Sequence, residues 1–220
     1  MKKLFILVSL VVGMMLFSIS SVLAASVYVD YMPGTWELSA GSSIDGDSNA
    51  AIIGVEQAID KFKINLEYTS SQLKDFLKID YDEDYAYLKD IDFSGFELKG
   101  GYQLTDQFSL NLSYLDQELE KSIFPDKIKF SGVMFGAEGN FKVADQVFVN
   151  GSLGFSVDGK AKSMGDDTDL DITNAKIKIG YQFTDNFSAT VGYRYAKYDA
   201  KDLNITFKNY GPTIGGTYTF

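Results

Sequence analysis

The sequence predicts an all-β protein, an antiparallel up-and-down transmembrane β-barrel of ten strands. Three observations point to it: segments in which apolar and polar residues alternate, tight turns that recur at a regular spacing, and an export signal at the start of the chain. Eight strands is the alternative, because the segment before the first turn is the least regular. Short turns are expected at the periplasmic rim and longer loops at the extracellular rim.

Residues 1–24 have the three-part layout of a secretory signal peptide. Lys2 and Lys3 precede an apolar stretch, and a polar stretch then leads to Ala24. The apolar stretch is shorter than the roughly 20 residues that a spanning helix needs. We therefore expect cleavage after Ala24 and export through the Sec pathway, not an uncleaved anchor. Residues 25–220 then form one barrel domain.

Four turns centred on aspartate divide this domain into hairpins. They recur about every forty residues, the spacing of a supersecondary repeat, and aspartate followed by Lys, Gln or Asn favours a hairpin turn. The four residues are Asp60, Asp106, Asp145 and Asp185. Four hairpins give eight strands. A strand before the first hairpin and a terminal strand from about Ile205 to Phe220 raise the number to ten.

The strands beside these turns alternate with period two, so each has one apolar and one polar face. The aromatic residues at the two ends of one apolar face are about six residues or 20 Å apart at strand rise. This is the spacing of two interfacial girdles around a lipid-facing band. We therefore expect the apolar face to point outward, whereas a lipocalin-like soluble barrel would turn it inward. The pairs are Phe62 and Tyr68, Phe108 and Tyr114, and Phe187 and Tyr193.

The first strand changes its pattern part-way. Apolar residues occupy odd positions from Val27 to Tyr31 but even positions from Trp36 to Ala40. An extra residue in a strand reverses such an alternation, and Pro33 with Gly34 would suit a bulge. We expect a bulge at this point.

Charged residues on the polar faces are expected to point into the barrel. They are Glu56, Lys63, Glu67, Glu97, Lys99, Glu138, Lys142, Lys176, Lys178 and Arg194. Their signs nearly balance, and a small barrel is filled largely by its own side chains. Internal ion pairs that hold a closed barrel are therefore expected. The alternative is a narrow polar channel, to which Lys176 and Lys178 would give an anion preference.

Composition excludes several functions. The formal charge of −10 becomes −12 once the two signal lysines are removed, so nucleic acid is not an expected partner. The chain has neither cysteine nor histidine, which removes disulfides, thiol chemistry and the usual general base. We expect no cofactor, no metal site and no catalytic residues, although a hydrolase that uses only carboxylates is formally possible.

The expected outer loops are acidic. Residues 71–92 contain Asp80, Asp82, Glu83 and Asp84 among tyrosines, and residues 165–171 contain four more aspartates. Both segments could bind divalent cations, but Asp167, Asp169 and Asp171 lack the turn glycine and distal glutamate of a calcium loop. Asp45, Asp47 and Asn49 have Ala50 where that glycine belongs. Solvated loop charge is the preferred interpretation. An extracellular ligand recognised by the tyrosine-rich acidic loops is the alternative.

The chain resembles small bacterial outer-membrane barrels of the OmpA, OmpX and opacity type, on its alternating strands and its terminal residues. Ile214, Tyr218 and Phe220 are similar to the signal that the barrel-assembly machinery recognises in such proteins. The resemblance implies a monomer in the outer membrane of a Gram-negative cell, with lipid and that machinery as partners. Related barrel enzymes need a catalytic histidine, which this chain lacks. We therefore expect a non-enzymatic structural or surface-binding role at the cell surface, with a porin-like channel as the alternative.

Overall fold

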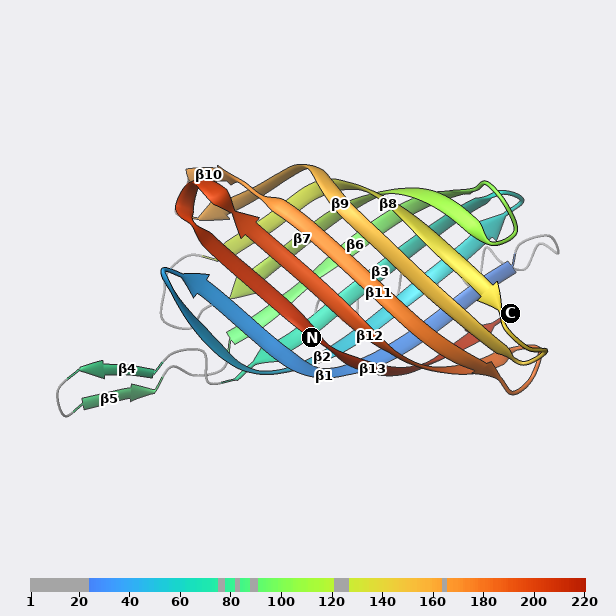
Figure 1. Ribbon diagram of the computed structural model, residues 1–220, viewed down its shortest axis with the longest axis horizontal. Helices are drawn as coiled ribbons and strands as arrows, with labels where there is room; N and C mark the ends of the chain where they lie inside the picture. Colours follow the sequence, from blue (N-terminus) through green and yellow to red (C-terminus); the bar gives the residue numbers. More distant parts are fainter. Residues whose placement is uncertain (1–23, 75–77, 82–83, 88–90, 121–126, 164–165) are drawn as a thin grey trace.

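The computed structural model describes residues 24–220 except 75–77, 82–83, 88–90, 121–126 and 164–165. Ten long antiparallel strands form its body (Figure 1). In chain order these are β1 (Ala24–Ala40), β2 (Ser42–Ile59), β3 (Phe62–Leu73), β6 (Ile91–Gln103), β7 (Phe108–Glu120), β8 (Ile128–Lys142), β9 (Val147–Ser163), β11 (Asp171–Gln182), β12 (Phe187–Ala200) and β13 (Ile205–Thr219). The predicted signal peptide lies outside the described residues apart from Ala24, at which β1 begins.

The ten strands close into a barrel in which each pairs with its neighbours along the chain. The pairing of β8 with β9 and of β13 with β1 completes the ring. This confirms the ten-strand prediction, including the uncertain first strand. Four small elements are added: β10 (Asp166–Asp169) pairs with β9, β4 (Lys78–Tyr81) and β5 (Asp84–Tyr87) form a separate hairpin, and η1 (Lys201–Leu203) is a 3-10 turn. Among the described residues, no helix is long and apolar enough to cross a membrane.

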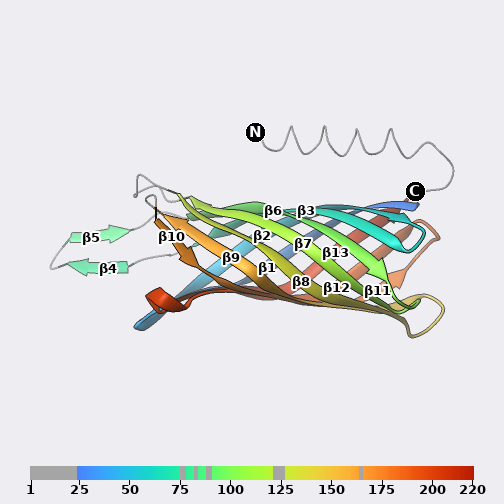
Figure 2. The same cartoon turned by 90° about the horizontal axis from the view of Figure 1, so that it is seen from above.

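The two ends of the barrel differ. One end, here called the turn end, carries the four predicted aspartate turns and both ends of the barrel chain, where the Phe220 amide donates to the Ala25 carbonyl over 2.9 Å. Asp60 takes a left-handed backbone conformation in the tightest of the turns. The opposite loop end carries the longer connections, and the β4–β5 hairpin extends beyond it (Figures 1 and 2).

Apolar side chains cover the outside of the barrel on its turn-end side. On β7, for example, Phe108, Leu112 and Tyr114 are all exposed. Aromatic rings pair on this outer face, as Phe62 does with Tyr102 at 5.2 Å between ring centroids. Such a surface is stable against lipid but not against water, because it is a contiguous apolar band that only hydrocarbon can cover.

The apolar residues change sides near the loop end while the pleat stays regular. On β7 the next apolar residues after Tyr114 are Leu115 and Leu119, which point inward and are buried. Near the loop end the barrel is therefore apolar inside and polar outside, as in a soluble barrel. This side of the barrel stands beyond the lipid-facing band.

The same change explains the first strand, where the predicted bulge was wrong. The register between β1 and β2 is unbroken from Ala24 opposite Ala58 to Ala40 opposite Ser42. Trp36 points into the barrel and is fully buried, because the apolar residues of this half belong to the interior. No residue is inserted at Pro33 among these pairs. The sequence alternation reversed because the environment reversed.

A bulge occurs instead in β9. Met134 pairs with Ser156 and Val133 with Asp158, so Val157 is the extra residue. The hydroxyl of Ser156 donates to the Leu170 carbonyl over 3.2 Å and accepts from the Ile172 amide over 2.7 Å. The side chain thus replaces the backbone ladder between β9 and β11 at the point where the bulge interrupts it.

Candidate functional site

Nine of the ten charged residues expected in the lumen line its two connected cavities. They come from six strands: Glu56 on β2, Lys63 and Glu67 on β3, Glu97 and Lys99 on β6, Glu138 on β8, Lys176 and Lys178 on β11, and Arg194 on β12. Lys142 is placed differently, at the rim of the turn end. Its side chain is 70% exposed and lies 4.0 Å from Asp145 of the adjoining turn. Lys142 occupies an inward position of β8, but the strand ends there, outside the enclosed lumen.

Two lumen residues on β1 were missed by the sequence reasoning. Asp30 is buried and forms an ion pair with Lys178, and the hydroxyl of Tyr28 donates to Glu67 over 2.8 Å. The sequence pattern could have placed both residues in the lumen, because positions 28 and 30 alternate with the lipid-facing Val27 and Val29. With Asp30 included and Lys142 set aside, the described lumen holds five acidic and five basic side chains.

The centre of the charge network is Glu67. Its carboxylate lies 2.6 Å from the Arg194 guanidinium and 4.0 Å from the Lys176 ammonium. Together with the Tyr28 hydroxyl, these groups tie β1, β3, β11 and β12 across the lumen. A charge-assisted hydrogen bond of this length is strong, and the burial of Glu67 makes the loss of its partners costly to stability.

Glycines on neighbouring strands provide the space for this network. A Cβ on Gly54 would lie 2.0 Å from the Tyr28 ring, and one on Gly215 would lie 1.9 Å from the Asp30 carboxylate. A larger residue at either position would displace the side chain that makes the contact. The glycines therefore fix where Tyr28 and Asp30 enter the lumen.

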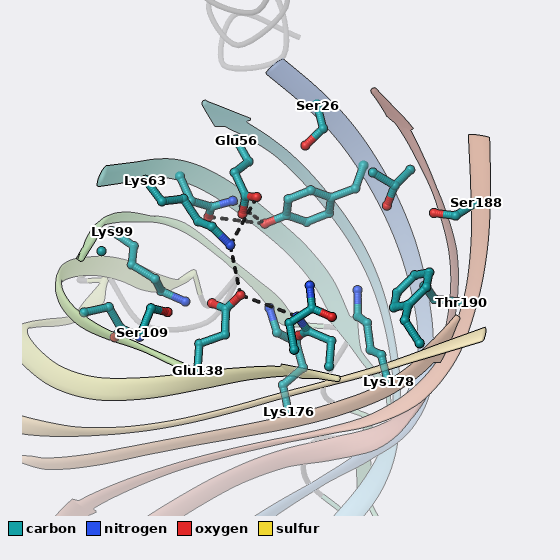
Figure 3. Close-up of a pocket in the computed structure, with 18 of the residues that line it drawn as sticks. Ser26, Glu56, Lys63, Lys99, Ser109, Glu138, Lys176, Lys178, Ser188 and Thr190 are labelled. Atoms are coloured by element: carbon teal, nitrogen blue, oxygen red, sulfur yellow. Dashed lines mark hydrogen bonds and ion pairs between the residues drawn. The ribbon is translucent and has the colours of Figure 1, made fainter. Parts of the chain in front are cut away.

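A second ion-pair group lies closer to the turn end. The Lys63 ammonium is 3.3 Å from Glu56 and 3.2 Å from Glu138, so one cation joins two acids on different strands. Asn150 donates to Glu138 over 3.5 Å. This group holds β2, β3, β8 and β9 together, and Figure 3 shows its side chains converging on the same cavity.

The lumen contains a polar cavity of about 250 Å³, here called the vestibule, and beneath it a cavity of about 30 Å³. Lys99, Asn111 and Lys176 line both cavities and so form the floor of the vestibule. A pocket of about 320 Å³ at the rim shares Asn140 and Phe148 with the vestibule. The lumen is thus reached from the turn end.

An apolar cluster, here called the plug, fills the lumen at the loop end. Four aromatic rings from four strands form its middle: Phe93 (β6), Phe130 (β8), Tyr198 (β12) and Phe207 (β13). All six pairs among them have centroids between 5.2 and 6.4 Å apart, the range of favourable aromatic contacts. Because β6 lies across the barrel from β12 and β13, the rings span the interior from one side to the other.

Acidic side chains at the loop end pair with lysines on the outer surface. Asp167 lies 3.0 Å from Lys162, and Asp169 and Asp171 pair with Lys160 and Lys201. The hydrogen bond that the Lys201 ammonium donates to Asp171 raises the pKa of Lys201. Within the described residues no group of three or more acidic side chains is placed to hold a metal ion. The acidic residues of the expected loop at 71–92 lie partly outside the described residues.

A family model described as the outer membrane protein beta-barrel domain matches residues 55–220. The chain belongs to this family. The solved structure of the outer membrane protease OmpT from Escherichia coli matches with a TM-score of 0.56 and 14% identity, over 90% of this chain and 96% of that one. Ail, the attachment invasion locus protein of Yersinia pestis, matches with a TM-score of 0.38 and 16% identity, over 90% and 98%. A search of curated proteins found no significant match.

The family places the protein in the outer membrane and orients the barrel. Short turns of such barrels face the periplasm and long loops face outward. The turn end and the vestibule therefore face the periplasm, and the plug lies at the extracellular end. Ile214, Tyr218 and Phe220, the residues expected to serve as an assembly signal, are exposed on the lipid face of β13 and at the chain end.

Proposed function

We propose that the protein is a closed, non-conducting outer membrane barrel that supports a structural or surface-binding role of its extracellular end. The observation that carries this proposal is the plug. Its four rings contact one another across the whole lumen, so an ion moving along the barrel axis would meet a close-packed apolar layer. Dehydrating an ion to pass such a layer is prohibitively costly.

The charge balance of the lumen supports the same proposal. Arg194, Lys63 and Lys178 each contact a carboxylate from another strand, so these cations stabilise the wall. A conducting pore needs charges that face moving ions and exchange partners with them. The polar vestibule favours the alternative, a porin-like channel, but it occupies only the periplasmic side of the plug.

An enzymatic role is not part of the proposal. The chain has no histidine and no cysteine, and the lumen carboxylates Glu56 and Glu67 are engaged in ion pairs. Glu67 and Glu138 in particular are bound to cations, so neither is free to act as a general base. The match to OmpT at 14% identity concerns the fold.

The extracellular end is the part of the molecule suited to binding. The barrel wall there is polar outside and rigid inside, and the β4–β5 hairpin extends beyond it (Figures 1 and 2). The sequence of this hairpin and its turn is acidic and rich in tyrosine. A rigid base that carries such a segment loses little entropy on binding a partner.

Planar-bilayer recording of the refolded mature protein tests the proposal. Heat-modifiable gel mobility first establishes that the barrel is folded. The expected result is no discrete current. Reproducible current steps from the folded, unmodified protein would overturn the proposal and make the channel the leading function.

A variant pair strengthens the test. The double variant Phe130→Ala/Phe207→Ala removes two plug rings, whereas Phe135→Ala/Phe187→Ala removes two rings from the lipid face. Only the first is expected to permit current and to increase acrylamide quenching of Trp36, the single tryptophan, which is buried in the plug. Equal currents from both variants would show that the plug is not the barrier.

A further inference from the structure

The lumen charges balance in number but not in position. Asp30 and Glu67 have side chains only 4% and 6% exposed, and neither of them lines the vestibule. Among the described residues, the vestibule itself is lined by four lysines, Lys63, Lys99, Lys176 and Lys178, but by only two acids, Glu56 and Glu138. The space inside the vestibule is therefore more positive than the lumen as a whole.

Both vestibule-facing acids are already committed to one cation. Glu56 and Glu138 each contact the Lys63 ammonium. Among the described residues, no acid that lines the vestibule is therefore left to pair with the other three lysines. Lys178 is neutralised by Asp30, which does not line the vestibule. Lys99 and Lys176 remain at the floor.

The two floor lysines are held less closely than the other lumen cations. Lys99 lies 3.7 Å from Glu97 and Lys176 lies 4.0 Å from Glu67, both longer than a hydrogen bond. Arg194 and Lys63, by contrast, lie within 2.6 and 3.2 Å of their acids. An ammonium group has three donors and no acceptor, so Lys99 and Lys176 can donate further hydrogen bonds to the oxygens of a ligand.

An amide between them adds neutral donors. Asn111 lines both cavities together with Lys99 and Lys176, and its side chain makes no hydrogen bond with any other residue that the structure describes. It is buried nonetheless. Two cations and an uncommitted amide at the base of a polar cavity are complementary to carboxylate or phosphate oxygens.

Access is from the periplasm. The vestibule and the rim pocket share Asn140, Phe148, Ser188 and Thr219, and the plug blocks the opposite direction. The barrel wall separates the floor from membrane lipid, so a lipid headgroup is not the expected occupant. A volume of about 250 Å³ is below the usual range for drug-sized ligands. The ligand must therefore be small.

We propose that the vestibule is a binding site for a small organic or inorganic anion of the periplasm, held by a carboxylate or phosphate group against Lys99, Lys176 and Asn111. This goes beyond the closed-barrel function and does not depend on it, because the absence of current in a bilayer is compatible both with a vestibule that binds a solute and with one that does not. The bound anion adds negative charge beside the two floor lysines, whose own acids Glu97 and Glu67 lie 3.7 and 4.0 Å away, and it ties β6, β7 and β11 together.

Isothermal titration of the refolded mature protein in zwitterionic detergent tests the site. Citrate and inorganic phosphate serve as the carboxylate and phosphate probes, glucose as the neutral probe, and sodium chloride keeps the ionic strength constant. Saturable binding of citrate or phosphate, with none of glucose, is expected. The better of the two anions identifies the ligand group. Absence of saturable binding by both anions to the folded protein would overturn the proposal.

Three variants locate the binding. Lys176→Met and Asn111→Asp should each weaken anion binding at least tenfold, and Asn111→Asp should also fold well because its carboxylate lies near two ammonium groups. Lys208→Met removes a lysine from the outer surface and should leave the affinity unchanged. Unaltered affinity in the folded Asn111→Asp protein, or equal loss in all three variants, would place the binding elsewhere.

Discussion

The most direct test of the lumen network concerns Glu67, because the structure makes it more important than its partner Arg194. The carboxylate accepts from Arg194 over 2.6 Å and from Tyr28 over 2.8 Å, and it lies 4.0 Å from Lys176. Removing the acid leaves two buried cations facing each other, whereas removing the arginine leaves the acid with a lysine and a hydroxyl.

The magnitudes follow from this asymmetry. Breaking a buried ion pair by removing one partner costs about 3–5 kcal/mol, and Glu67→Gln should fall in that range. In Arg194→Met the remaining Lys176, at 4.0 Å, attracts Glu67 with about 4 kcal/mol of gross Coulomb energy at an effective dielectric constant near 20. Part of the loss is thereby offset. We expect about 1–3 kcal/mol for Arg194→Met, at least about 1 kcal/mol less than for Glu67→Gln.

Urea unfolding in lipid vesicles, followed by the fluorescence of Trp36 and by gel mobility, measures both values. Glu37→Gln is the control, because Glu37 forms a pair of similar length, 2.8 Å from Lys208, on the outer surface. That pair lies on the outer surface with side chains 24–28% exposed and should contribute at most about 1 kcal/mol. The reasoning fails if Arg194→Met is as costly as Glu67→Gln, or if Glu67→Gln is no more costly than the control.

Two further substitutions test how single residues hold the strands. Ser156→Ala removes the hydroxyl that joins Leu170 and Ile172 at the bulge and should cost about 1–3 kcal/mol in unfolding free energy, because one buried amide and one carbonyl lose their partner. Gly54→Ala places a methyl group 2.0 Å from the Tyr28 ring, so the ring must move and its hydrogen bond to the network is lost; urea unfolding should show a loss of about 1–3 kcal/mol.

Matched controls exist for both. Ser94→Ala removes a hydroxyl from the outer face of β6 and should change the unfolding free energy by less than about 0.5 kcal/mol. Gly101→Ala adds a methyl group that meets nothing closer than 3.7 Å. Equal stability of Ser156→Ala and Ser94→Ala would contradict the bridging role, and a Gly101→Ala protein as unstable as Gly54→Ala would contradict the steric argument.

The sequence alone predicted the architecture because the architecture depends on local pattern. Asp60, Asp106 and Asp185 marked turns that the structure contains, and strands β3, β7 and β12 begin at the residues expected, Phe62 and its counterparts. Period-two alternation needs no knowledge of distant residues, since a strand has only two faces. An aromatic at each end of one face then sufficed to assign that face to lipid.

Only the tertiary structure decided how the interior is arranged. Alternation places Lys178 and Glu67 in the lumen, but which acid meets which base depends on how ten tilted strands are staggered when the sheet closes. No pattern in the sequence indicates that Lys178 pairs with Asp30, or that Glu67 ties β3 to β1, β11 and β12.

The plug shows the same limit most clearly. Trp36 and Phe207 are apolar residues at inward positions of their strands. If every apolar residue is assumed to face lipid, the position of Trp36 can be explained only by a bulge in the first strand. The level at which the barrel leaves the membrane determines whether an apolar side chain is stable outside or inside. That level is a property of the closed barrel in its surroundings, so it is visible only once all ten strands are in place.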